Sequence, residues 1–501
     1  MTTLEQNVVD LVKPFIEETR PALESLLVDT EQEIPISSLP PELLSEIFML
    51  CCQPKYNAIG GVDSQAICPL RLAAVCKAWR DLAWTTSRLW SVIILMWSHP
   101  CAFHLEGVLD SWIKRAGAQP LSIRYEAQSN SLLSRLIQET SKWMNVTIKC
   151  PPSKFCSAIE TYNYFPLLEH LSIRVRVGYY DPASSNPLHC LDDLDIFNCS
   201  SLPNITRLHV PGHLQCFKPN LMWSQLRTFS VSCIDSENLC NILDLAKFLE
   251  VFSATFLDWA YTNGDILQTV NHSYLRCLVF KEVPSGKSLN ELLSTPSIST
   301  PNLEDLTIEM NRGHERPDPN STFLSKFITS LHQLRRIKVK YYDTHDPKWV
   351  FQWLLNIPSL TELDVQASPS AIANIVSALG NPASTETTTE YLPLLVNLTI
   401  TQWDNLIMKD IPEMLAYRSS GVSPSISRLK SASLHQISES FSQEDFDAFQ
   451  MASLGDLALK MIDRKGCLNL GTPYSSHQFN RQELTASEQS AMDLSVELPE
   501  R

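Results

Sequence analysis

"TPNLEDLTI", residues 300–308, is one copy of a nine-residue phrase that returns many times along the chain. Its apolar residues follow the pattern L-x-x-L-x-I, and the last two are separated by one residue. Alternation with a period of two is typical of a strand that turns every second side chain into a core. The nine copies are "FPLLEHLSI" (165–173), "LPNITRLHV" (202–210), "WSQLRTFSV" (223–231), "AKFLEVFSA" (246–254), "HSYLRCLVF" (272–280), "TPNLEDLTI" (300–308), "LHQLRRIKV" (331–339), "IPSLTELDV" (357–365) and "LPLLVNLTI" (392–400).

The spacing of these phrases indicates a repeat of one strand and one helix. Their first apolar positions recur at steps of 21 to 37 residues, which brackets the period of a leucine-rich repeat. Segments between them, such as "LCNILDLAKF" (239–248) and "FLSKFITSLH" (323–332), carry apolar residues at helical spacing. In five phrases a proline two residues before the first apolar position would stop the preceding helix and let a strand begin. These prolines are Pro166, Pro203, Pro301, Pro358 and Pro393.

We therefore predict an α/β fold in which residues 165–435 form an irregular, curved solenoid of parallel strands with helices on the outer side. The alternative is an ordinary α/β domain with leucine-rich strands. Residues 97–164 are predicted to be a linker and a divergent first repeat region, and 436–465 to be C-terminal capping helices. The remaining ends are predicted to be a helical segment at 1–35 and a polar, flexible tail at 466–501.

The stretch "ISSLPPELLSEIFMLCC" (36–52) predicts a helix that begins at Pro40 and Pro41, where a missing N–H costs little. Its apolar side chains project within about 140° of one another, which is wider than one helical neighbour needs. These side chains are Leu43, Leu44, Ile47, Phe48 and Cys51. Helical spacing resumes in "PLRLAAVCKAWRDLAW" (69–84), which places Leu72, Val75, Cys76, Trp79, Leu82 and Ala83 on one face.

Two or three short helices in about 60 residues are too small to hide this much apolar surface among themselves. Either later segments of the chain cover it, or a partner protein does.

Bulk composition excludes several classes of partner. The net charge is −15 and the pI is about 5.3, so the chain repels phosphate backbones and anionic lipids, and we expect neither nucleic acid nor membrane partners. The longest apolar run, "VIILMW" (92–97), is too short to span a bilayer. The 14 cysteines include no C-x-x-C pair and the first residues lack a secretory pattern, so we expect a reducing compartment, cytoplasmic or nuclear.

The sequence shows no pattern of catalysis or of cofactor binding. A P-loop, a G-x-S-x-G elbow, an H-E-x-x-H motif and a dinucleotide glycine fingerprint are all absent. His209 and His213 have Pro and Gly between them and cannot share a helix face as metal ligands. We expect no cofactor, no metal and no enzyme; an unrecognised enzymatic site has no residue pattern in its favour.

The residues of the two helical stretches also resemble a known motif. Their order closely resembles the F-box, in the form found in fungal F-box proteins, although the loop at 53–68 is longer than in that family. Residues 110–126, "DSWIKRAGAQPLSIRYE", resemble the segment that joins the F-box to leucine-rich repeats in fungal members. The matching residues are Leu39, Pro40, Pro41, Glu42, Leu43, Leu44, Ile47, Phe48, Leu70, Leu72, Val75, Cys76, Lys77, Trp79, Arg80, Leu89 and Trp90.

This resemblance implies that 36–96 docks on a Skp-type adaptor of a cullin-based SCF ubiquitin ligase, and that the repeats bind a protein client. Catalysis would then belong to other subunits. The implied adaptor contacts are Leu39, Pro40, Leu43, Leu44, Ile47, Phe48, Leu72, Val75, Cys76, Trp79 and Trp90. For Trp79 and Trp90 a place in the core of the small bundle is the open alternative. A second function remains open: a leucine-rich-repeat scaffold or regulatory protein without client ubiquitination. The client is not predicted by the sequence.

Overall fold

The computed structural model divides the chain into two compact units, residues 1–205 and 206–501. It describes residues 36–52, 58–59, 69–95, 102–126, 129–150, 155, 159, 164–174, 201–213, 223–234, 236–255, 270–283, 298–310, 331–341, 354, 357–380, 391–402, 410–420, 426–437, 443–452, 457–463 and 467–470. The helical segment predicted at 1–35 and the tail beyond 470 lie outside these residues.

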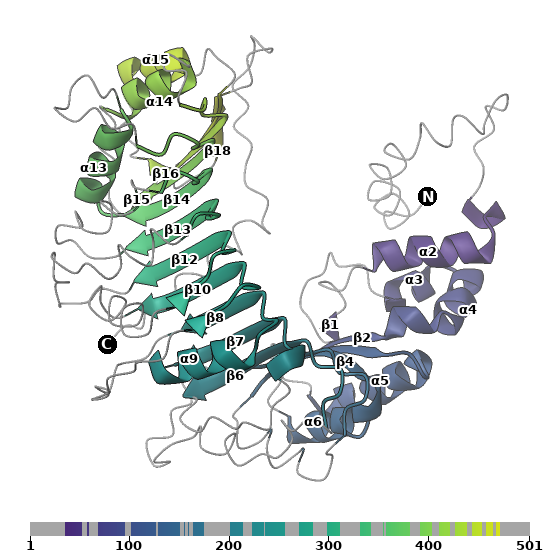
Figure 1. The fold of residues 1–501 in the computed structure, drawn as a ribbon. Helices are drawn as coiled ribbons and strands as arrows, with labels where there is room; N and C mark the ends of the chain where they lie inside the picture. Colours follow the sequence, from purple (N-terminus) through teal and green to yellow (C-terminus); the bar gives the residue numbers. More distant parts are fainter. Residues whose placement is uncertain are drawn as a thin grey trace. The chain divides into compact units, whose positions relative to one another are not determined.

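The described part of the first unit begins with a group of short helices, as predicted (Figure 1). Pro41 occupies the first position of its helix, where proline needs no hydrogen-bond partner. The helical spacing of 69–84 is interrupted at Cys76, which was predicted to share a face with Leu72 and Trp79. Cys76 has an extended backbone, and its Sγ accepts the Trp79 N–H, so it caps a second helix. The elements are η1 (Ile36–Ser38), α2 (Pro41–Cys51), α3 (Pro69–Val75), α4 (Lys77–Thr85) and η3 (Ser87–Trp90).

A parallel sheet follows in the same unit, with its strands in chain order. Figure 1 shows the connecting helices α5 (Ala102–Ala116) and α6 (Asn130–Ile137) beside this sheet. The strands are β1 (Ala58–Ile59), β2 (Val92–Leu95), β3 (Leu121–Tyr125), β4 (Trp143–Lys149) and β5 (His170–Arg174), with η4 (Thr140–Lys142) before β4. Strand β2 lies inside the range 36–96 that we assigned to the helical bundle. Its four consecutive apolar residues show no alternation, so the sequence pattern did not mark it as a strand.

Tryptophan side chains join the helices to this sheet. Trp90 is fully buried, and its Nε1 donates to the Ala83 carbonyl at 2.7 Å. Its ring meets that of Trp112 on α5, with centroids 4.8 Å apart and nearly perpendicular planes. The Trp112 Nε1 in turn donates to the Val92 carbonyl at 3.1 Å. The short helices are therefore linked through Trp90 and Trp112 to strand β2.

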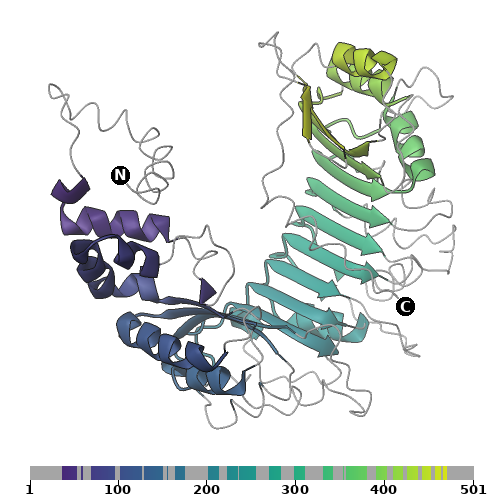
Figure 2. The ribbon, with the colours of Figure 1, turned by 180° about the vertical axis from the view of Figure 1, so that it is seen from behind.

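The second unit contains a longer sheet whose strands stack in chain order (Figure 2). All neighbours from β6 to β17 pair in parallel, and β18 pairs with β17 antiparallel. The strands are β6 (Arg207–His213), β7 (Thr228–Cys233), β8 (Val251–Thr255), β10 (Cys277–Val283), β12 (Asp305–Met310), β13 (Arg336–Tyr341), β14 (Glu362–Ala367), β15 (Asn397–Gln402), β16 (Ser431–Ile437), β17 (Ala458–Asp463) and β18 (Cys467–Leu470). A separate parallel pair joins β9 (Val270–Asn271) to β11 (Ile298–Ser299).

The strand predicted in each of the nine phrases is confirmed. In every copy the strand begins five residues after the first letter of the phrase. The registers align the same positions from strand to strand: Leu306 faces Leu278 on one side and Ile337 on the other. The chain is therefore α/β with a large parallel sheet. Each phrase contributes two inward apolar side chains, which form two columns across neighbouring strands.

Four described helices of at least ten residues accompany this sheet: α9 (Ser236–Leu245), α13 (Pro369–Leu379), α14 (Ile411–Ser420) and α15 (Gln443–Ala452), with η6 (Trp223–Gln225) before β7. The capping helices predicted at 436–465 are only partly correct, because 458–463 is strand β17. The physical reason is the alternation of Leu457, Leu459 and Met461, all of which are buried in the sheet register. Strand β18 likewise falls in the range that we assigned to the tail.

Arg418 is a charged residue inside this unit. It lies on α14 and is only 3% exposed. Its guanidinium donates to the carbonyl oxygens of Leu379 and Leu392, each at 3.1 Å, and also to that of Tyr391. These three carbonyls end α13 and begin the next phrase, so one side chain ties α14 to both segments. Buried carbonyls without a donor are costly, which makes this contact a structural requirement.

We predict that Arg418→Leu lowers the free energy of unfolding by about 2–4 kcal/mol, because three carbonyls lose their charged donor. Urea denaturation followed by tryptophan fluorescence measures this loss. Arg428→Leu is the matched control, since Arg428 is exposed, and should change the free energy of unfolding by less than about 0.5 kcal/mol. Equal midpoints for the two variants would contradict this role of Arg418.

Candidate functional site

The broad apolar stripe of α2 divides into an inner and an outer half. Leu44 and Phe48 are buried, and the Phe48 ring lies 4.9 Å from the Trp79 ring of α4. The outer half consists of Leu43, Ile47 and Leu50, spaced four and three residues apart and hence on one side of the helix. Leu43 is 55% exposed and Leu50 is 52% exposed, while Ile47 is half-buried. We call these three residues the outer face of α2.

The predicted adaptor contacts are therefore separated by their burial. Leu39 and Val75 are half-buried, and Pro40 and Cys76 are exposed. The remaining predicted residues, apart from Leu43 and Ile47, are interior: Leu44, Phe48, Leu72, Trp79 and Trp90. Phe48 was expected to face a partner, but it lies in the interior, where its ring packs against that of Trp79 on α4.

Two adjacent thiols lie at the end of α2. Burial raises the pKa of the Cys51 thiol, which keeps it protonated near neutral pH. Cys52 is buried. Both therefore act as small apolar groups at the end of α2.

In the second unit the outward-facing side chains of the strands carry charges of alternating sign. Basic residues on β13 pair with acids on β12 and β14: Lys338 Nζ lies 2.8 Å from Asp364, and Lys340 Nζ lies 3.0 Å from Glu309. Arg336 forms two hydrogen bonds with Asp305, one of them at 2.6 Å. These charges neutralise one another within the sheet, and exposed pairs of this kind contribute little stability.

A second row of charges precedes the strands. The residue directly before each of β7, β8, β10, β12 and β13 is charged, and the sign of the charge alternates from one strand to the next. We call this row the charged rim: Arg227, Glu250, Arg276, Glu304 and Arg335. The backbone N–H of each member donates to the carbonyl of the previous one at 2.8–2.9 Å, so the row continues the strand ladder. The spacing of the charges is therefore set by the sheet.

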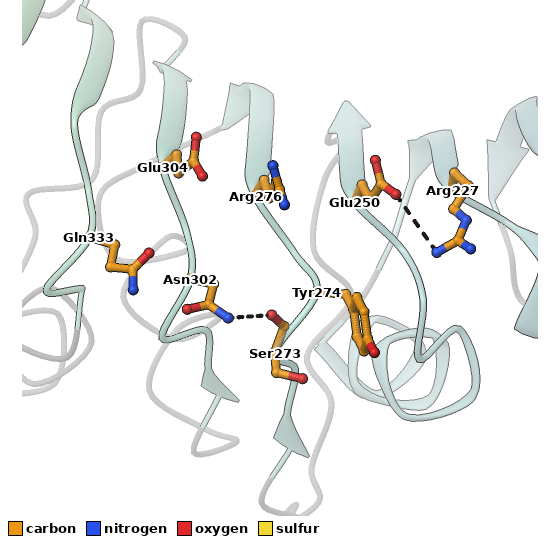
Figure 3. Close-up of a pocket in the computed structure, with 8 residues that line it drawn as sticks. All are labelled: Arg227, Glu250, Ser273, Tyr274, Arg276, Asn302, Glu304 and Gln333. Carbon is orange, nitrogen blue, oxygen red and sulfur yellow. Dashed lines mark hydrogen bonds and ion pairs between the residues drawn. The ribbon is translucent and has the colours of Figure 1, made fainter.

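A pocket of about 730 Å³ opens along four members of the charged rim (Figure 3). Arg276 lies between Glu250 and Glu304, yet among the described residues neither Arg276 nor Glu304 makes a side-chain ion pair or hydrogen bond. Arg227 differs, because its Nη1 lies 3.7 Å from Glu250. The other wall of the pocket is formed by Ser273, Tyr274, Asn302 and Gln333. The pocket is thus lined by a guanidinium and a carboxylate that pair with no other side chain in the described part of the chain.

Two exposed aromatic rings lie beside this pocket. Phe248 is 39% exposed and Tyr274 is 49% exposed, and their centroids are 5.1 Å apart with an edge-to-face arrangement. The Arg227 guanidinium lies 5.3 Å from the centroid of Phe248. Exposed aromatic pairs next to cations are common in surfaces that bind protein segments.

A buried histidine holds the turn that carries one pocket wall. His272 is 2% exposed, its Nε2 donates to the Ala246 carbonyl at 2.9 Å, and its Nδ1 accepts the Leu275 N–H at 3.1 Å. Both nitrogens are occupied in the neutral form, and burial lowers the pKa of this imidazole. Ser273 and Tyr274 lie between these anchored residues, so the neutral ring fixes their turn.

Some of these features were not predicted from the sequence. Leu50 was not part of the predicted stripe, although it lies seven residues after Leu43 and three after Ile47, a helical spacing that could have identified it. The charged rim is visible as the fifth letter of five consecutive phrases, but its meaning depends on the strand register.

Among the described residues no group of three or more His, Cys, Asp or Glu is placed to hold a metal ion. Nor is any helix in the described ranges both long and apolar enough to cross a membrane.

No protein-family model matches this chain, and a comparison with curated proteins gives no match.

We predict that stability decreases as pH falls below about 6.5, because the unfolded state binds a proton that folded His272 resists. The folded pKa is below the unfolded value, so the contribution is complete above that pH and is lost progressively on acidification. The slope is at most about 1.4 kcal/mol per pH unit for one such group. Urea midpoints measured between pH 7.5 and about 5 test this, with His272→Gln expected to flatten the dependence.

Exposed His332 provides the matched control, since His332→Gln should leave the pH dependence unchanged. His435 is half-buried, and burial lowers the pKa of its imidazole as well, so part of the dependence will remain in the His272 variant. An identical slope in the parent chain and in His272→Gln would contradict the assignment.

Proposed function

We propose that this protein is a non-catalytic substrate-recognition subunit of an SCF-type ubiquitin ligase, with an F-box at its helical bundle and leucine-rich repeats in its sheet. The single observation that carries the proposal is the outer face of α2, which leaves two leucines about half exposed on one helix. Covering each exposed leucine would contribute on the order of 1 kcal/mol or more.

The interior of the bundle supports this reading of the outer face. Phe48 and Trp79 pack against each other, and the Arg80 Nε donates to the Ala73 carbonyl at 2.9 Å, which joins α4 to α3. A fixed bundle can present Leu43 and Leu50 without rearrangement, which reduces the entropic cost of binding. In this proposal the contacts with a Skp-type adaptor are Leu43, Ile47 and Leu50, with Leu39 and Pro40 beside the start of α2. The interior residues act indirectly, by holding α2 in place.

The sheet supplies the client-binding half of the proposal. Its outward side chains lie on a hydrogen-bonded ladder and are therefore held at regular intervals. A rigid array can keep a client at a fixed distance from a ubiquitin-charged enzyme and so raise the effective concentration of its lysines. No chemical step is assigned to the chain itself.

We predict that Leu43→Glu reduces recovery of a co-expressed Skp-type adaptor at least about tenfold, because a charge would be buried in the interface. Co-purification of the full chain with a tagged adaptor measures the recovery. Leu394→Glu makes the same change at a leucine that is 46% exposed before β15, and it should retain the adaptor. Circular dichroism checks that both variants are folded.

Equal adaptor recovery for the parent chain and Leu43→Glu would reject the docking surface. If the adaptor binds and proteasome inhibition leaves the abundance of co-purified partners unchanged, the protein acts as a scaffold without client degradation. Accumulation of such partners would support the role in client recognition.

A further inference from the structure

The charged rim carries information about what the second unit binds. Successive parallel strands lie about 4.8 Å apart, so cations on every second strand recur at about 9.6 Å. Arg227, Arg276 and Arg335 precede β7, β10 and β13, which are separated by one intervening strand in each case. A ligand that meets all three must therefore repeat at close to that interval.

Few extended peptides have this repeat. In a β-strand, side chains on one face recur every second residue, at about 6.6 Å, which does not match the rim. In a polyproline II helix three residues make one turn and rise about 9.3 Å, so every third side chain returns to the same face. The polyproline II period thus agrees with the cation spacing within a few tenths of an ångström per turn.

The aromatic pair beside the pocket is an independent indication of the same ligand. Proline-rich segments in this conformation bind between exposed aromatic rings, because the preformed helix loses little entropy on binding. Tyr274 lines the pocket and Phe248 contacts it edge to face. The Arg227 guanidinium lies over the Phe248 ring, and Tyr274 lines the same pocket as Arg227 and Arg276, so one peptide can contact rings and guanidinium groups together.

The sign of the ligand follows from the charges that remain available. Arg276 and Arg335 make no side-chain ion pair or hydrogen bond among the described residues, and the rim as a whole has three cations and two anions. A carboxylate is the ligand that a guanidinium binds most strongly, through two parallel hydrogen bonds.

We propose that the charged rim and its pocket bind a proline-rich protein segment in the polyproline II conformation, with an acidic residue at every third position. Glu250 and Glu304 give the site its selectivity. They alternate with the arginines along the rim, so they repel a segment that carries carboxylates along its whole length. The inference rests on the proposed function only in identifying the segment as part of a client.

The test uses the full chain and a fluorescein-labelled peptide of five Glu-Pro-Pro repeats, with binding followed by fluorescence anisotropy at low ionic strength. A peptide of identical composition with its five glutamates consecutive should bind about tenfold more weakly, since no more than two of its glutamates lie on one face of the helix. A peptide of Lys-Pro-Pro repeats should bind no better than the consecutive-glutamate peptide. Equal affinity for the repeat and the consecutive peptide would overturn the proposal.

Variants of the rim separate recognition from general charge. Arg276→Gln should weaken binding of the Glu-Pro-Pro peptide about tenfold, because a charge-assisted pair is lost. Arg428→Gln removes the same charge from an exposed position five strands further along the sheet and should leave the affinity unchanged. Glu304→Gln should improve binding of the consecutive-glutamate peptide. Unchanged affinity in Arg276→Gln, with the fold intact by circular dichroism, would overturn the proposal.

The adaptor-docking proposal and the rim-site proposal can be rejected independently of each other. Leu43→Glu lies in the other unit and should not alter the peptide affinity. Loss of peptide binding with the adaptor retained would reject only the rim site, while loss of the adaptor with the peptide retained would reject only the docking surface.

Discussion

The register of the parallel strands is the constraint on which the second unit depends. In each phrase two apolar positions must point inward, and Phe280, Ile308 and Val339 show one such column continuing through three neighbouring strands. A slip of one residue would turn both columns toward solvent and the polar residues toward the core. Burial of the apolar columns thus fixes where every outward side chain and every rim residue lies. The outward positions are then free to carry charge without weakening the core.

This constraint explains which parts of the fold the sequence could predict. The nine phrases identify their strands correctly because their pattern is local. Two apolar residues separated by one residue mark the strand, and a further apolar residue lies three positions before them. Strand β16 has Ala432 at one inward position, and β2 is apolar throughout, so neither shows that pattern and only pairing with neighbours reveals them. Strand β17 has alternating Leu459 and Met461, but the amphipathic stretch before it favoured a helix. The local pattern therefore does not identify the strands that pairing shows at β2, β16 and β17.

The candidate surface on α2 was predicted in outline and divided only by the structure. The sequence gives the width of the apolar stripe, and a width of about 140° exceeds the requirement of one neighbour. It does not give the direction from which that neighbour approaches. Contact between Phe48 and Trp79 settles the direction, which buries one half of the stripe and leaves Leu43 and Leu50 outside. An anchor residue for a partner and a core residue have the same chemistry, so only the packing of α4 distinguishes them.

The five charges of the rim recur in the sequence, but their residues lie 23 to 31 positions apart, so the sequence alone does not show that they form one row. Its regularity arises when the backbone of each member bonds to the next, which converts a distant repetition into a row of charges with a fixed interval. Because these side chains are outward, their replacement costs the fold little, whereas a change in sign alters every neighbouring interaction in the row. The sheet therefore separates two requirements that usually conflict: the inward columns determine stability, and the rim determines which ligand charges are accepted. A repeat protein of this kind can change its ligand by exchanging single rim residues while the strand register stays the same.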